Sequence, residues 1–177
     1  MTKKKKAARK WISAKAEISH CKKYRYSLSR FITTGKKTMV FVMLNPSTAD
    51  AMKDDATIRR CVSFAKRESC DIVEVVNLYG YRATNPKKLW TVDDLHGPEN
   101  TKFVATAVRG ADIVVCAWGN NARMADVYDF LDRYEFKKLK CLGVTKTGMP
   151  KHPLYIKSDQ ELLNYDFDDA KAWNGVK

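Results

Sequence analysis

Two asparagines stand where a polar side chain could do chemistry. Asn45 and Asn77 each end an apolar run that is typical of a buried strand. An amide carries a donor and an acceptor side by side, so Asn77 could match the Watson–Crick edge of a pyrimidine. Asn45 is too weak a base to take a proton, but it could hold a water molecule. Structural roles remain open for both: an Asx-turn in Asn45-Pro46-Ser47, and bonds from Asn77 to loop backbone.

A histidine late in the chain offers a third functional group. Its loop, residues 146–155, holds two prolines and a glycine and is expected to be stiff and exposed. Lys146 and Lys151 oppose protonation of His152, and a neutral imidazole N–H is a suitable donor to a forming oxyanion. An ordinary surface histidine is the alternative. The chain has neither metal-ligand spacing nor a phosphate-binding G-x-x-x-x-G-K-[ST] motif, so we expect no metal and no cofactor.

The elements that must position these side chains follow from hydrophobic periodicity. Four apolar, β-branched runs predict strands, and they cover residues 39–44, 72–78, 113–118 and 139–144. Helical patterns lie between them, at residues 55–68, 99–109 and 122–134. This alternation predicts an α/β fold, a three-layer αβα sandwich whose central, mainly parallel sheet has about four strands.

Two further segments flank this pattern. Residues 20–31 alternate bulky and polar side chains, which predicts a strand that could be one side of an antiparallel hairpin. Residues 158–169 are acidic and predict an edge helix or a tail. Open parallel sheets bind ligands beyond the carboxyl ends of their strands. Since Asn45, Asn77 and His152 all follow predicted strands, we expect them to converge on one pocket at that edge.

The composition is that of one basic domain. The chain has 177 residues, 45% of them hydrophobic, and we expect a single α/β domain over residues 11–177. The net charge is +13, and six of the positive charges fall within residues 1–10, which we interpret as a disordered basic arm. Such an excess favours a polyanionic partner, nucleic acid before membrane. A basic protein with a solvated tail explains the charge equally well.

The cysteines and the hydropathy indicate a compartment. Five cysteines, an odd number without a C-x-x-C pair, argue against a disulfide framework or a zinc ribbon. No apolar stretch approaches the roughly 18 residues of a membrane span, and no apolar segment follows the basic N-terminus as in a secretory signal. We therefore expect a cytoplasmic, DNA-associated monomer that makes no contact with a membrane.

Four short motifs stand in order at the predicted strand ends: MLNP at residues 43–46, VVNL at 75–78, VCAWGNNA at 115–122 and HPLY at 152–155. Together they resemble the motifs of the uracil-DNA glycosylase superfamily, which implies the fold of that superfamily over residues 39–155. More narrowly, the runs LNPSTAD, NLYGYRATNP and KTGMPKHPLY are similar to an uncharacterised bacterial and phage family, domain of unknown function sixteen-forty-three.

The resemblance implies a role for each residue. Asn45 would position the attacking water, as in the mismatch-specific and thymine glycosylase branch, and His152 would stabilise negative charge on the departing base. Asn77 would read the flipped pyrimidine. Further contacts to the base would come from Ser47, Tyr79 and Pro46. The DNA backbone would be held by Arg82, Arg123, Lys146, Lys151 and Tyr155.

The motifs depart from the superfamily pattern in ways that bear on specificity. Met43 stands in place of a glycine, which alters the approach of the backbone to the substrate. Ser47 stands in place of a tyrosine that excludes groups on the pyrimidine C5, so a C5-modified base would fit. The HPLY motif lacks a serine that contacts phosphate. Asn45 in place of an aspartate implies slow hydrolysis.

Two functions from different classes follow. The first is a DNA glycosylase-like enzyme that flips a modified or mismatched pyrimidine and hydrolyses its N-glycosidic bond. The second is a binding module of the same fold, in phage DNA modification or defence, that recognises a base or nucleotide without cleaving it. A free nucleotide as substrate is a third option, which the charge of +13 disfavours because a small ligand needs no such field.

Overall fold

The computed structural model describes residues 11–47, 49–134 and 138–165, so the expected basic arm at residues 1–10 lies outside the described residues. The strands are β1 (Ser13–Ile18), β2 (Arg25–Phe31), β3 (Thr38–Met43), β4 (Ile72–Asn77), β5 (Ile113–Cys116), β6 (Leu139–Cys141) and β7 (Leu163–Asn164). The α-helices are α1 (Ala56–Arg67), α2 (Asn100–Gly110) and α3 (Met124–Arg133). Short 3-10 helices are η1 (Pro86–Thr91), η2 (Gly119–Asn121) and η3 (Pro153–Tyr155).

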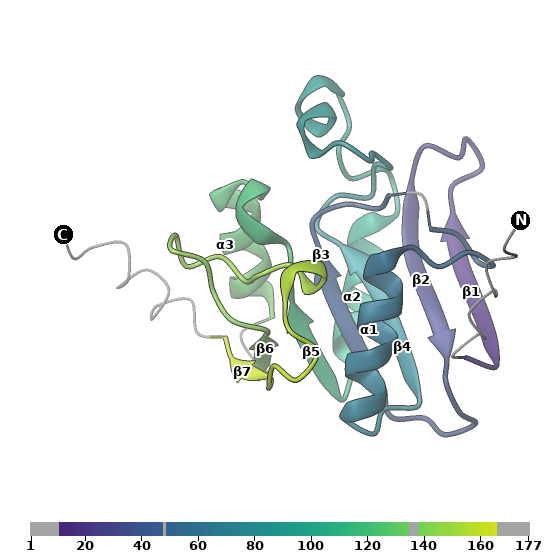
Figure 1. Ribbon diagram of the computed structural model, residues 1–177. Helices are drawn as coiled ribbons and strands as arrows, with labels where there is room; N and C mark the ends of the chain where they lie inside the picture. Colours follow the sequence, from purple (N-terminus) through teal and green to yellow (C-terminus); the bar gives the residue numbers. More distant parts are fainter. Residues whose placement is uncertain (1–10, 48, 135–137, 166–177) are drawn as a thin grey trace, which may run out of the picture.

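The seven strands form one mixed sheet in the order β1-β2-β4-β3-β5-β6-β7 (Figure 1). β3 pairs in parallel with β4 and β5, and β5 pairs in parallel with β6. The pairings β1–β2, β2–β4 and β6–β7 are antiparallel. The predicted α/β fold is confirmed, but the sheet is mixed and has seven strands rather than about four mainly parallel ones, because antiparallel strands extend both edges. These edge strands lack continuous apolar runs: β1 is partly exposed and β7 has two exposed residues.

The first two strands form the hairpin that the alternation in residues 20–31 predicts. Ser13 pairs with Phe31 and Ala16 with Leu28. β2 begins only at Arg25, because the residues before it turn the chain back from β1. At the other end of the sheet, the acidic segment holds the short strand β7 rather than an edge helix, and the remainder of that segment, from residue 166, lies outside the described residues.

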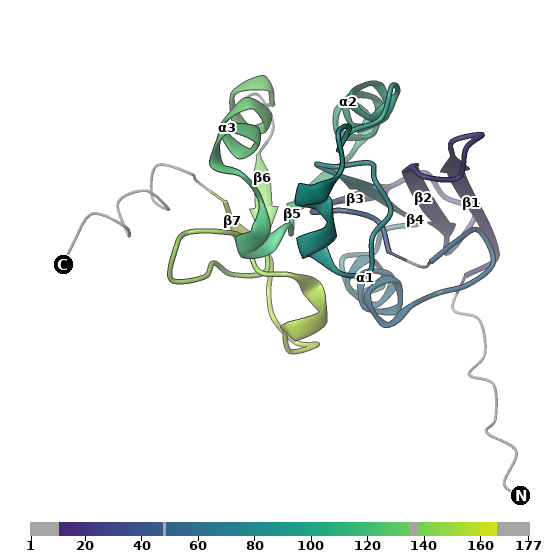
Figure 2. The ribbon, with the colours of Figure 1, turned by 90° about the horizontal axis from the view of Figure 1, so that it is seen from above.

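Helices cover both faces of the sheet (Figure 2). On one face, Ile58 of α1 is buried in one cluster with Phe41 of β3. On the opposite face, Val108 of α2 and Val127 of α3 are buried together with Val42 of β3. Alternate residues of a strand point to opposite faces, so a strand covered on both sides must be apolar throughout. No helix in the described ranges is long and apolar enough to cross a membrane.

The parallel strands bring their carboxyl ends to one edge. The register sets Met43 beside Asn77 and Val42 beside Cys116, so β3, β4 and β5 end at the same level. The segments that follow these strands therefore leave the sheet side by side, and the site predicted from the sequence has to be sought there.

Candidate functional site

A cavity of about 700 Å³ lies at the carboxyl edge of the sheet. Asn45, Asn77 and His152 all line it, although they come from three separate segments of the chain. Asn45 follows β3, Asn77 ends β4, and His152 precedes η3. The volume is within the range of small-molecule sites, roughly 300–1,000 Å³.

Asn77 presents an amide that the protein itself does not use. Its side chain is 1% exposed, and neither Nδ2 nor Oδ1 has a hydrogen-bond partner among the described residues. The side chain of Asn77 is thus not the backbone-bonding structural amide that the sequence left open. Its main-chain carbonyl accepts a hydrogen bond from Nδ2 of Asn100 instead, at 3.0 Å. A buried amide without a partner is destabilising by about 1–3 kcal/mol, which favours a ligand that pairs with it.

The amide nitrogen of Asn45 connects two segments at the edge of the cavity. Its Nδ2 donates to the carbonyl oxygens of Pro46, at 3.0 Å, and Ala83, at 2.7 Å. These two bonds tie the end of β3 to the segment that follows β4. Because both amide protons are then committed, Oδ1 is the atom that remains for a water or a ligand, and it can only accept.

His152 is held as a neutral ring. Its Nδ1 accepts a hydrogen bond from the backbone N–H of Leu154 at 3.3 Å, so the proton of the neutral imidazole sits on Nε2. Burial lowers the pKa of His152, and the charge of Asp55 opposes that shift. The expected neutral state thus has a different cause from the one inferred from Lys146 and Lys151. Lys146 is exposed and does not line the cavity, whereas Lys151 does.

A carboxylate at the start of α1 also lines the cavity. Asp55 is the N-cap of α1, where Oδ1 accepts from the N–H of Ile58 at 2.8 Å. Its Oδ2 accepts from the hydroxyl of Ser47 at 2.9 Å. Ser47 lines the cavity as well, which agrees with its predicted place beside a ligand.

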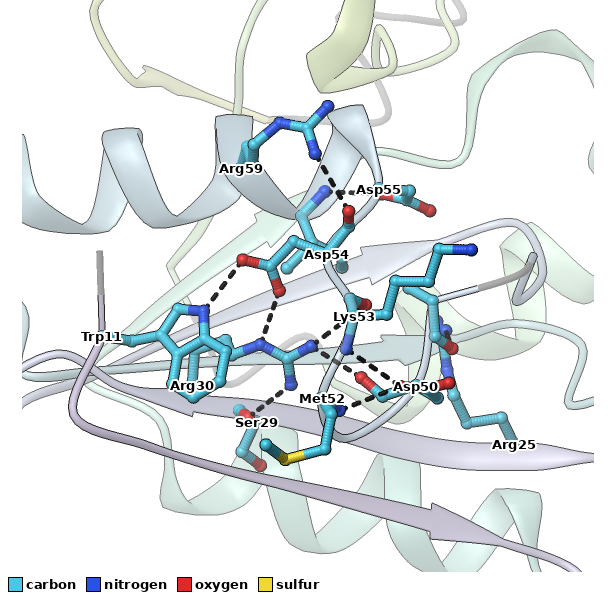
Figure 3. Close-up of polar contacts among 12 residues, drawn as sticks. Trp11, Arg25, Ser29, Arg30, Asp50, Met52, Lys53, Asp54, Asp55 and Arg59 are labelled. Carbon is cyan, nitrogen blue, oxygen red and sulfur yellow. Dashed lines mark hydrogen bonds and ion pairs between the residues drawn. The ribbon is translucent and has the colours of Figure 1, made fainter. Parts of the chain in front are cut away.

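Two buried arginines of β2 fasten the segment that carries Asp55 (Figure 3). Arg30 donates from Nε to Asp54 at 2.7 Å and from Nη2 to the carbonyl of Asp50 at 2.7 Å. Trp11 donates to the other oxygen of Asp54 at 2.8 Å, and the guanidinium of Arg30 lies over the Trp11 ring. Arg25 donates from Nη1 to the carbonyl of Ala49 at 2.8 Å.

Arg25 and Trp118 are cavity residues that the sequence reasoning missed. Arg25 is 3% exposed, and burial lowers its pKa to about 10, opposed by the charge of Asp55. An arginine at the start of an alternating strand is expected to face solvent, so the sequence held no signal for its burial. Trp118 closes an apolar run, and its indole N–H is buried without a partner among the described residues.

Two of the residues expected to contact a base do not line the cavity. The hydroxyl of Tyr79 donates to Asp126 at 2.6 Å and accepts from the backbone N–H of Arg123, and its ring is buried beside α3. Tyr79 therefore anchors the start of α3. Pro46 is buried, and its carbonyl accepts from Asn45 and from the N–H of Ala83.

Two of the five side chains expected to hold the DNA backbone line the cavity, and a third lies in a groove beside it. Lys151 and Tyr155 line the cavity, and Tyr155 is 82% exposed at its mouth. Arg82 lies in an adjoining groove with Lys22 and Lys23, which shares Ser47, Ala83 and Thr84 with the cavity. Arg123 stacks over the Trp90 ring, 4.4 Å from its centroid.

Within the described ranges, no group of three or more histidine, cysteine, aspartate or glutamate side chains is placed to hold a metal ion. The cavity instead combines hydrogen-bond donors and acceptors: the amides of Asn45 and Asn77, the imidazole N–H of His152 and the guanidinium of Arg25. Such a set can bind and orient a polar ring and can stabilise negative charge that develops on it.

A family model described as "Protein of unknown function (DUF1643)" matches residues 25–154. No curated protein and no solved structure matches the chain. The matched range begins with β2 and ends inside η3, so it includes every cavity residue discussed above except Tyr155.

Proposed function

This chain belongs to the DUF1643 family of proteins of unknown function, and we propose that it binds a pyrimidine flipped out of DNA and hydrolyses its N-glycosidic bond. The observation that carries the proposal is the amide of Asn77. This amide is buried, lines the cavity, and has no partner for either polar atom among the described residues. A pyrimidine edge offers the donor and the acceptor that this amide lacks.

The remaining groups fit a hydrolysis in which the base leaves as an anion. The bond from the sugar C1′ to N1 of the base breaks, and its electron pair goes to the base. Water attacks C1′, and the proton that it loses passes to solvent, from which the base anion is reprotonated. The Nε2–H of His152 is available to donate to the charge on the departing base. Oδ1 of Asn45 is available to accept a hydrogen bond from the attacking water.

Two wider features support a DNA substrate and a uracil-DNA glycosylase-like fold. The net charge of +13 favours a polyanion, and Lys22, Lys23 and Arg82 line a groove beside the cavity. The helices on both faces of the sheet, with the cavity at the carboxyl edge of the parallel strands, are the arrangement that the motif resemblance implies.

The test is base release from labelled duplexes that contain uracil, a thymine mispaired with guanine, or 5-hydroxymethyluracil. Free base is measured by chromatography and abasic sites by alkaline nicking. We expect His152→Ala to lower turnover by about 10²–10³-fold with little change in DNA affinity, the loss typical of a missing oxyanion donor. His20→Ala removes an exposed histidine that does not line the cavity and serves as the matched control. Wild-type turnover in His152→Ala would disprove the role of His152.

A binding module without cleavage is the second candidate. The observation that favours it is that position 45 holds an amide, which cannot take a proton from the attacking water. This reading predicts tight binding of a base or nucleotide, lost in Asn77→Ala, with no base released from any duplex. Measured release by the wild type would exclude it.

A further inference from the structure

We propose that Arg25 binds an anionic oxygen group, a carboxylate or a phosphate, on the ligand of the cavity. The inference rests on the proposed function for the base-binding end of the cavity. It adds a second recognition group whose charge and position come from β2, a strand that the motif resemblance does not include.

The guanidinium of Arg25 is buried and largely unpaired. It is 3% exposed and lines the cavity, and within the described residues it makes one hydrogen bond, from Nη1 to the carbonyl of Ala49. Its Nε is buried without a partner. No carboxylate of the described ranges lies within 4.0 Å of its nitrogens. A guanidinium has five N–H donors, so most of its capacity is unused.

Among the described residues, the one carboxylate that lines the cavity is already engaged. Asp55 accepts from the N–H of Ile58 with one oxygen and from the hydroxyl of Ser47 with the other. It acts on Arg25 through its charge but forms no ion pair with it. Burying a cation without a bonded anion is unfavourable, and an anionic group on a ligand would remove that penalty.

A structural role explains the neighbouring arginine but not Arg25. Arg30, five positions along the same strand, is 0% exposed and pairs with Asp54, and it also bonds the carbonyls of Ser29 and Asp50. Both arginines hold the segment beside them, but Arg30 lies among several acceptors (Figure 3), whereas Arg25 donates to one carbonyl.

The other unpartnered atoms of the cavity wall show the same imbalance. Asn77 offers Nδ2 and Oδ1, Trp118 offers its indole N–H, and Arg25 offers Nε. Among these buried atoms, donors thus exceed acceptors by three to one. The edge of a pyrimidine pairs with both ends of the Asn77 amide, which leaves the donors of Trp118 and Arg25 for further oxygen atoms of the ligand.

Two sources could supply the anion: a carboxyl substituent on the base, or the phosphate of the nucleotide itself. Calorimetric titration of the full-length protein distinguishes them with two probe pairs, 5-carboxyuracil against uracil and dUMP against deoxyuridine. We expect at least one anionic probe to bind about 10–100-fold more tightly than its neutral partner, the range for a hydrogen bond to a charged group.

Variants assign that preference to Arg25. Arg25→Met should abolish the difference in affinity between each anionic probe and its neutral partner. Arg25→Lys, which keeps a charge but not the planar fork, should retain only part of that difference. Arg109→Met, which removes an exposed arginine of α2, is the control and should keep the preference. Asn77→Ala should weaken the neutral probes too, so failure of base recognition is seen separately from failure of anion recognition.

A preference for the carboxylated base alone, or for the nucleotide alone, supports the proposal and names the source. Equal binding of each charged probe and its neutral partner by the wild type, including no binding of either, overturns it. So does a preference that survives undiminished in Arg25→Met.

Discussion

The variants Arg30→Met and Arg25→Met each remove a guanidinium from a buried position of β2. The difference lies in what each guanidinium contacts. Arg30 is paired with Asp54 at 2.7 Å and bonds the carbonyls of Ser29, Asp50 and Lys53. Arg25 bonds one carbonyl. The two variants therefore separate the loss of a paired charge from the loss of an unpaired one.

The expected magnitudes follow from these contacts. Removing one partner of a buried ion pair destabilises a protein by about 3–5 kcal/mol. Asp54 keeps 17% of its side-chain surface, so we take the lower end of that range for Arg30→Met. That corresponds to a fall of Tm by roughly 6–12 °C in a chain of this size. For Arg25→Met the lost hydrogen bond, about 1 kcal/mol, is offset by removal of a desolvated charge, so we expect Tm to stay within about 3 °C of the wild type or to rise.

Urea denaturation and thermal melting, both followed by far-ultraviolet circular dichroism, measure these changes. Asp54→Asn tests the same pair from its other side and should lower stability in the same direction as Arg30→Met. Equal losses for the two arginine variants would refute the reasoning, because they would mean that Arg25 is as well paired in the ligand-free protein as Arg30.

Three further outcomes are expected. Asn77→Ala should change Tm little, since the amide has no partner to lose, whereas Asn100→Ala removes bonds to two carbonyls and should lower stability by about 1–3 kcal/mol in urea denaturation. The pKa of His152 is lowered in the folded protein, so the unfolded chain takes up the proton first and the free energy of unfolding falls as pH drops below about 6.5. His152→Gln should flatten this dependence between about pH 7 and 5. An unchanged slope of the free energy of unfolding against pH would contradict the prediction. Deletion of residues 1–10 should reduce the salt dependence of DNA binding, by about 0.9 in log–log slope per lost phosphate contact, and an identical slope would show that this segment makes none.

Sequence periodicity located the strands that are buried on both faces and the helices between them. The run predicted as a strand at residues 39–44 corresponds to β3, and the helix predicted at residues 55–68 corresponds to α1, which Asp55 caps. Edge strands were harder, because an exposed strand needs no apolar face: β1 and β7 have few buried residues and carry no pattern that distinguishes them from loops.

The site could be predicted where it depends on strand ends, and not where it depends on pairing across the sheet. Asn45 and Asn77 stand at the ends of recognisable parallel strands, and both line the cavity. Arg25 reaches the same cavity only because β2 pairs antiparallel with β4. The two strands are far apart in the sequence, as the pairing of Leu28 with Val75 shows. No local sequence pattern predicts a pairing between strands so far apart in the chain.

The hairpin partner β1 also protects the edge of the sheet. β2 uses one side of its backbone to pair with β4 and the other to pair with β1, yet the family match begins at Arg25 and leaves β1 outside. A fragment trimmed to that boundary would expose the N–H and C=O groups along β2, which readily pair with the edge of another molecule. It would also lose the bond from Trp11 to Asp54. We therefore expect a fragment starting at Arg25 to associate into larger species on size-exclusion chromatography, whereas one starting at Trp11 should not; the unit to produce for study is longer than the unit that the family shares.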